Sequence, residues 1–135
     1  MGHWSGKKVL VAGGTGLIGT PVTELLVELG ANVRIASLDD LSLAPKEAEF
    51  VKANLMDYQN CLKVCKSINY VFNLLCVKGS PKMAKERPAT FWDILTTLNS
   101  NLARAALENR VGGFLYTSSV GVYSPSEIMR EDDVW

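Results

Sequence analysis

Four glycines placed close together, Gly13, Gly14, Gly16 and Gly19, carry the clearest chemistry in this chain of 135 residues. A short apolar run at 9–11 precedes them and an apolar-periodic segment follows, so the predicted order is strand, glycine loop, helix. Such a loop lets backbone approach a pyrophosphate, and the helix start adds free N–H groups and a positive dipole end. The segment therefore predicts a dinucleotide-binding turn.

Each glycine has its own expected role in this turn. We expect positive φ angles at Gly13 and Gly14, because a tight chain reversal needs them. The missing side chain of Gly16 leaves space for the pyrophosphate, and that of Gly19 lets the helix pack closely on the strand.

The rest of the chain alternates short apolar strands with helical segments. We expect Asp57 to cap the second helix, and Thr90, paired with Asp93, to cap the third. Because strands and helices alternate, the predicted fold is α/β: a Rossmann-like, doubly wound parallel sheet of about five strands in order 3-2-1-4-5. The chain, 1–135, is expected to form one domain. The predicted strands span 8–12, 32–37, 49–53, 69–76 and 114–118, the helices 17–29, 58–67 and 91–109, and the loops 38–48 and 77–89.

Composition narrows the partners and the compartment. Lys plus Arg and Asp plus Glu both number 14, so no basic field indicates nucleic acid or an anionic membrane. No apolar stretch is long enough to span a bilayer and no signal peptide is visible, which favours the cytoplasm. Cys61 and Cys65 are expected on a buried helix face rather than at a metal site, and His3 in a frayed tail.

In a doubly wound sheet, ligands bind beyond the carboxyl ends of the strands, where the strand order reverses. This rule brings together the glycine loop, Ser37, Asn54, residues 75–76 and residues 117–119. A crevice between the first and fourth strands is therefore the expected binding site.

Four segments, at 12–19, 53–55, 71–74 and 117–123, resemble the N-terminal half of the extended short-chain dehydrogenase/reductase family. The resemblance covers about 8–124 and rests on the glycine loop together with the Thr-Ser-Ser-x-x-Val-Tyr segment. It implies an NAD(P)-binding oxidoreductase domain of the epimerase/dehydratase type, truncated relative to the full family domain. Such enzymes act mostly on nucleotide sugars, which are the implied substrate.

The same resemblance implies a role for individual residues. Ser119 takes the position of the catalytic serine, which hydrogen-bonds the substrate hydroxyl or keto oxygen. The residues expected to bind the cofactor are Gly13, Gly14, Thr15, Gly16, Leu17, Ile18, Gly19, Ser37, Asp39, Asn54, Leu55, Leu74, Leu75, Cys76, Thr117 and Ser118.

The chain also departs from the family pattern. The family acid/base pair, Tyr-x-x-x-Lys, is absent, because no tyrosine of the chain has lysine four residues later. Asn54 replaces the usual Asp, and Leu75 and Cys76 are bulkier than the usual residues. We therefore expect the chain to bind the cofactor but to be incomplete for catalysis. The alternative is a non-catalytic nucleotide-binding sensor or assembly module. The two hypotheses are distinguished by whether the gene continues past Trp135 into a Tyr-x-x-x-Lys segment.

The sequence leaves the choice between NAD and NADP open. Ser37 stands where an acidic residue would hold both ribose hydroxyls, with Asp39 as a second candidate two residues later. Ser37 would not repel a 2′-phosphate, whereas Asp39 would do so if it faces one.

We predict that the chain forms a homodimer, through the 91–109 helix or through the tail 119–135, which the two subunits could exchange. The helix carries a wide apolar stripe, and the fifth strand leaves an unpaired sheet edge. Light scattering at high protein concentration measures the mass, and a monomer there would contradict the prediction.

Overall fold

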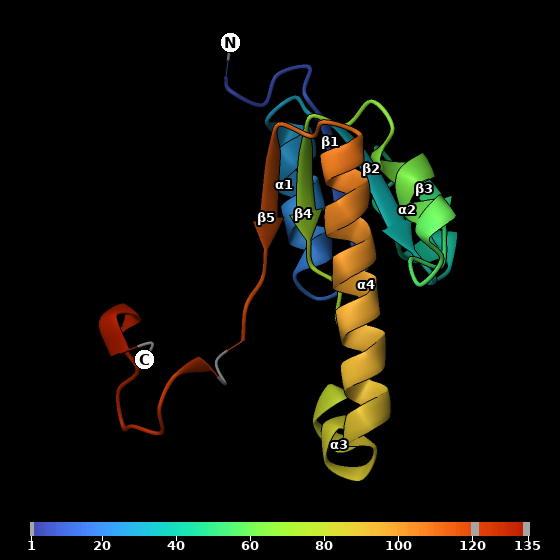
Figure 1. The fold of residues 1–135 in the computed structure, drawn as a ribbon. Coiled ribbons are helices and arrows are strands. Elements are labelled where there is room, and N and C mark those ends of the chain that lie inside the picture. Colours follow the sequence, from blue (N-terminus) through green and yellow to red (C-terminus); the bar gives the residue numbers. More distant parts are fainter. Residues whose placement is uncertain (1, 120–121, 134–135) are drawn as a thin grey trace.

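The computed structural model describes residues 2–119 and 122–133 as one α/β unit (Figure 1). Its strands are β1 (Lys8–Ala12), β2 (Asn32–Ser37), β3 (Glu49–Lys52), β4 (Tyr70–Asn73) and β5 (Gly113–Tyr116). Its helices are α1 (Gly19–Glu28), α2 (Tyr58–Cys65), α3 (Ser80–Glu86) and α4 (Pro88–Glu108), with short 3₁₀ turns η1 (Leu41–Leu43) and η3 (Glu131–Asp133).

The five strands form one parallel sheet in the order β3-β2-β1-β4-β5, which confirms the predicted topology. Strand β1 lies at the centre, where Val11 pairs with Ile35 on one side and Phe72 on the other. Helix α1 lies on one face of the sheet and α2 and α4 lie on the other (Figure 1). The strand order reverses between β1 and β4, as expected for a site at their carboxyl ends.

The side chains of β1 alternate between two apolar clusters, because successive strand residues point to opposite faces. Leu10 packs towards α2 and α4 with Cys61 and Leu102, and all three are fully buried. Val9 packs towards α1 with Leu26. The central strand is therefore covered on both faces, as its unbroken apolar sequence predicts.

The prediction of a loop over 77–89 was wrong, because α3 occupies most of it. Helix α4 also begins at Pro88, two residues before Thr90, and no side chain caps its first turn. Each helix carries a proline in its first turn, where the missing N–H has no intrahelical partner to lose. Pro81 and Pro88 thus lie in the first turns of helices, and the Thr90 capping box does not form.

The other element boundaries differ from the predictions by a few residues. The Asp57 cap is confirmed, since its carboxylate accepts the N–H of Gln59 at 2.9 Å. Helix α1 begins at Gly19 instead of residue 17, and β4 ends at Asn73 instead of residue 76. Because β4 ends at Asn73, residues 74–78 form a loop beyond its carboxyl end.

The N-terminal segment packs on the sheet, so the prediction of a frayed tail at His3 was wrong. The rings of His3 and Trp4 lie 4.9 Å apart, and both contact the ring of Tyr70 at 5.5 and 5.2 Å. These aromatic residues cover part of the β4 face that α1 leaves open.

The segment after β5 runs away from the sheet (Figure 1). Residues 120–121 of the family-like segment and residues 134–135 of the tail lie outside the described residues. The exchange of this tail between subunits stays a prediction. Within the described part of the chain, no helix is long and apolar enough to cross a membrane.

Replacement of Gly19 by alanine should destabilise the fold by about 1–3 kcal/mol, the range for overpacking a tight contact. A Cβ at Gly19 would overlap the carbonyl oxygen of Gly13 and lie 2.7 Å from the Cα of Gly14. Gly112→Ala is the control, because its Cβ would meet nothing nearer than the Asn69 carbonyl oxygen at 3.4 Å. Urea unfolding measures both variants, and equal stabilities would contradict the prediction.

Candidate cofactor-binding site

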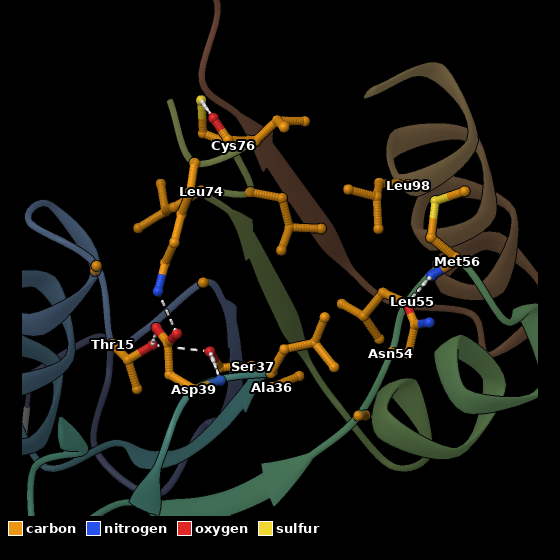
Figure 2. Close-up of a pocket in the computed structure, with 18 of the residues that line it drawn as sticks. Thr15, Ala36, Ser37, Asp39, Asn54, Leu55, Met56, Leu74, Cys76 and Leu98 are labelled. Atoms are coloured by element: carbon orange, nitrogen blue, oxygen red, sulfur yellow. Dashed lines mark hydrogen bonds and ion pairs between the residues drawn. The ribbon is translucent and has the colours of Figure 1, made fainter. Parts of the chain in front are cut away.

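A pocket of about 710 Å³ lies beyond the carboxyl ends of β1, β2, β3 and β4. Figure 2 shows Thr15, Ser37 and Asp39 together on one side of it and Leu55, Met56 and Leu98 on the other. The pocket therefore has a polar end beside the glycine loop and an apolar end beside α4. It lies at the switch point of the sheet, where the topology predicts a ligand.

The chain turns sharply at Gly13, directly after β1. Gly13 has φ +82°, which confirms the prediction for this residue, and its N–H donates to the Ala36 carbonyl at 2.9 Å. The carbonyl of Gly13 in turn accepts the N–H of Gly16 at 3.0 Å. A Cβ at Gly13 would lie 2.9 Å from the carbonyl oxygen of Leu74, so this turn passes directly against the chain that leaves β4.

Gly14 has a different role from the one predicted. Among the described residues, the glycines with positive φ are Gly6, Gly13, Gly30 and Gly79, so the prediction for Gly14 was wrong. A Cβ at Gly14 would lie 2.8 Å from Cγ1 of Ile35 and 3.2 Å from Oγ1 of Thr23. Glycine is required here because the turn packs on β2 and α1, below the pocket.

The first turn of α1 points into the pocket without a cap of its own. Its N-cap residue, Ile18, makes no side-chain hydrogen bond to it, and no acidic residue lies in the turn. The first N–H groups of a helix have no intrahelical partner and carry the positive end of its dipole. Together with the bare backbone of Gly16, this end of the pocket is suited to a phosphate or pyrophosphate group.

The polar end of the pocket is a connected network of side chains. Oγ1 of Thr15 donates to Oδ2 of Asp39 at 2.8 Å and lies 2.8 Å from Oγ of Ser37. The Lys78 ammonium donates to Oδ1 of Asp39. The hydrogen bonds from Lys78 and then Thr15 hold the pKa of Asp39 below its usual value, so the carboxylate is ionised at neutral pH.

Asn54 and the residues after it form the floor of the apolar end. Oδ1 of Asn54 accepts the N–H of Met56 at 3.0 Å, which leaves this oxygen one further acceptor position. Leu55 is buried beneath it, and Ile94 and Leu98 of α4 close the far wall. A flat, partly apolar group with one donor would fit between these residues.

A buried asparagine holds the wall formed by residues 74–76. Asn73 is 1% exposed, donates to Oδ1 of Asn99 on α4 at 2.7 Å, and accepts the N–H of Leu75 at 3.3 Å. Leu75 packs against the core cluster beneath α4, whereas the Cys76 thiol is exposed. The bulky Leu75 side chain is thus accommodated partly in the core.

The structure brings most of the predicted site residues together. Four lie outside the pocket lining: Gly14, Thr117, Ser118 and Ser119. Thr117 is bound to the end of β4, where its hydroxyl and N–H both donate to the Asn73 carbonyl at 3.3 Å. The cofactor-binding roles, and the catalytic role of Ser119, stay predictions. The predicted residues that line the pocket are Gly13, Thr15, Gly16, Leu17, Ile18, Gly19, Ser37, Asp39, Asn54, Leu55, Leu74, Leu75 and Cys76.

Sequence reasoning missed several residues of the lining. Val77 and Lys78 directly follow the predicted wall, so extending the predicted site into the loop predicted over 77–89 would have included them. Ile94 and Leu98 are four residues apart on one face of α4, and only the position of that helix over the pocket reveals their role. The missed residues are Ala36, Leu38, Ala53, Met56, Val77, Lys78, Ile94 and Leu98.

The glycine turn, the uncapped helix and the ionised carboxylate at the end of β2 together define a Rossmann-type dinucleotide-binding domain. A family comparison agrees: the model of the NAD dependent epimerase/dehydratase family matches residues 9–134. The chain belongs to this family, and its cofactor is therefore a nicotinamide dinucleotide.

Curated relatives are longer than this chain. A GDP-mannose 3,5-epimerase from rice (Oryza sativa subsp. indica) is 25% identical over 144 residues, which cover 98% of this chain and 38% of the relative. The corresponding protein from Arabidopsis thaliana is 28% identical over 94 residues, covering 64% of this chain and 25% of the relative. The chain thus spans well under half the length of these relatives.

The solved structures that the chain resembles are also longer, and the chain matches less than half of each. An epimerase from Methanothermobacter thermautotrophicus, Mth375, has a TM-score of 0.86 and 29% identity over 98% of this chain and 42% of its own. MoeE5, solved with UDP-glucose and NAD, has a TM-score of 0.80 and 25% identity over 94% of this chain and 42% of its own. This chain therefore corresponds to the nucleotide-binding half of such proteins.

A thiol reagent should modify Cys76 in the native protein and spare the other two cysteines. Cys61 and Cys65 are buried, and burial raises the pKa of their thiols to about 11 and about 12. A dinucleotide bound in the pocket should slow the labelling of Cys76, which lines it. Mass spectrometry after a timed reaction measures this, with Cys76→Ser as the control. Equal rates with and without bound dinucleotide would contradict the prediction.

Proposed function

We propose that this chain is the NAD-binding part of an oxidoreductase that modifies a nucleotide sugar. The observation that carries the proposal is the crevice at the β1–β4 switch point, which combines the glycine turn at the uncapped start of α1 with an ionised carboxylate just after β2. These two features match the diphosphate and the ribose of the adenosine diphosphate portion of the cofactor.

Each part of the adenosine diphosphate portion has residues suited to hold it. The pyrophosphate would meet the backbone at Gly16 and the first turn of α1, and the adenine would lie near Asn54 and Leu55. The ribose hydroxyls would donate to Asp39. When bound, NAD supplies a hydride acceptor, and these residues would bind and orient it.

The position of Asp39 favours NAD over NADP. An ionised carboxylate can accept both ribose hydroxyls of NAD, whereas it repels the 2′-phosphate of NADP. Thr15 and Ser37 fix its orientation from two neighbouring segments, since Oγ of Ser37 also accepts the Asp39 N–H at 3.1 Å. We therefore assign to Asp39, rather than to Ser37, the role of accepting the ribose hydroxyls.

The proposed substrate rests on the relatives. MoeE5 was solved with UDP-glucose and NAD, and an epimerase from Methanobrevibacter ruminantium, 25% identical to this chain, was solved with UDP-N-acetylmuramic acid. We infer a nucleotide sugar as substrate, with Ser119 hydrogen-bonding its reacting oxygen. The Tyr-x-x-x-Lys pair is absent from the 135 residues.

We propose the homodimer and the cytoplasmic location that the sequence predicts. A homodimer is supported by the exposed ring of Trp92 on α4 and by the half-exposed side chains of Phe114, Leu115 and Tyr116 on the edge strand β5. The free thiols of Cys61, Cys65 and Cys76 fit the reducing cytoplasm.

Titration calorimetry tests the proposal directly. We expect the chain to bind NAD, and Gly16→Val to weaken that binding at least about tenfold, because its side chain would occupy the pyrophosphate path. Gly112→Ala, at the far end of the sheet, should bind as the native chain does. Thermal melts verify that both variants are folded.

Absence of heat with either dinucleotide at millimolar concentration would overturn the proposal. Equal affinities of Gly16→Val and the native chain would place the cofactor away from the glycine cradle.

A further inference from the structure

Two charged residues line the pocket within the described part of the chain, Asp39 and Lys78. They come from different segments: Asp39 follows β2, and Lys78 lies in the loop between β4 and α3. Their charges are opposite, so this end of the pocket is neutral overall. Whether a doubly charged phosphate is attracted or repelled here depends on which of the two groups faces it.

The two groups form an ion pair with unequal exposure. Nζ of Lys78 lies 2.5 Å from Oδ1 of Asp39, and the two side chains are 84% and 20% exposed. The lysine thus reaches in from solvent to a carboxylate that the pocket partly encloses. The carboxylate is the fixed partner, because Thr15 also holds it, whereas the lysine is anchored by this contact at its tip.

Both groups retain unused hydrogen-bonding capacity. A carboxylate has about four acceptor positions, and two of those on Asp39 are taken by the side chains of Thr15 and Lys78. An ammonium has three donors, of which Lys78 uses one in this pair. Asp39 can therefore accept ribose hydroxyls without releasing Lys78, and the ammonium of Lys78 keeps two donors for a further acceptor.

Arg34, the basic residue of β2, makes its hydrogen bonds outside the pocket. Nε of Arg34 donates to Glu49 at 2.9 Å, and its Nη1 donates to the carbonyls of Val64 and Lys66 at the end of α2. Arg34 does not line the pocket. Lys78 is therefore the lining residue that can supply a positive charge to a ligand.

We propose that Asp39 and Lys78 form a two-part selector for the 2′ position of the bound adenosine ribose, in which Lys78 is the specificity-determining cation that Asp39 restrains. This inference rests on the proposed function and deepens it. With Asp39 present, the carboxylate accepts hydroxyls and excludes a 2′-phosphate. Without it, the ammonium of Lys78 is released to bind that phosphate, so one substitution reverses the cofactor preference.

Calorimetry with NAD and NADP tests the selector on four chains: native, Asp39→Asn, Lys78→Met, and the double variant. Asp39→Asn should raise the ratio of NADP to NAD affinity about tenfold or more, because it leaves an unopposed positive charge beside the phosphate. Lys78→Met should lower NADP affinity below that of the native chain. The double variant should lose the gain of Asp39→Asn.

Lys82→Met is the matched control. Lys82 lies four residues further on, on α3, pairs with Glu86 at 4.0 Å and does not line the pocket. It removes the same charge from the same region, so the Asp39→Asn/Lys82→Met chain should keep the gain in NADP affinity. That gain should also fall as salt is raised, since an exposed charge contact is screened.

Two results separate the possible failures. If the Asp39→Asn chain gains no NADP affinity, or the double variant with Lys78→Met keeps the gain, the selector is wrong while NAD binding still supports the proposed function. If neither dinucleotide binds any of the chains, the proposed function fails and the selector fails with it.

Discussion

The backbone contact between Gly19 and the turn at Gly13 is the constraint on which the rest of the site depends. A side chain at Gly19 would overlap the Gly13 carbonyl, and one at Gly13 would press on the Leu74 carbonyl at 2.9 Å. The end of β1, the start of α1 and the exit of β4 therefore meet at a point where only bare backbone fits. Because they meet there, the uncapped end of α1 faces the crevice, and the loop after β4 passes beside it.

The parallel sheet places several loops around this local contact, and together they form the site. Since all five strands run in the same direction, the loops after β1, β2, β3 and β4 leave the same edge and surround one pocket. Hydrogen bonds then tie three of these loops together, through Thr15, Asp39 and Lys78. The buried Asn73, bonded to Asn99, holds the wall of the pocket against α4. Binding geometry and fold stability are thus supported by the same contacts.

Much of this arrangement follows from local sequence patterns. The apolar runs of β1 and β2 have the predicted bounds, and Asp57 caps α2 as expected, because these signals depend on neighbouring residues alone. Errors occur where one local signal has two structural meanings. Proline breaks a helix or begins one, and within the predicted loop 77–89 Pro81 and Pro88 lie instead in the first turns of α3 and α4. Glycine supplies either a positive φ or an absent side chain, and Gly14 requires the second.

Sequence patterns alone predict the class of fold, the strand order and most of the pocket lining, because periodicity and glycine spacing are properties of the chain. Which polar groups meet depends on the three-dimensional packing. Asp39 and Lys78 are 39 residues apart, and no local pattern pairs them. That packing also placed Leu98 of α4 in the pocket and left Ser119 outside its lining. Such contacts depend on where whole elements come to lie, which is set by the packing of α4 and β5 on the sheet.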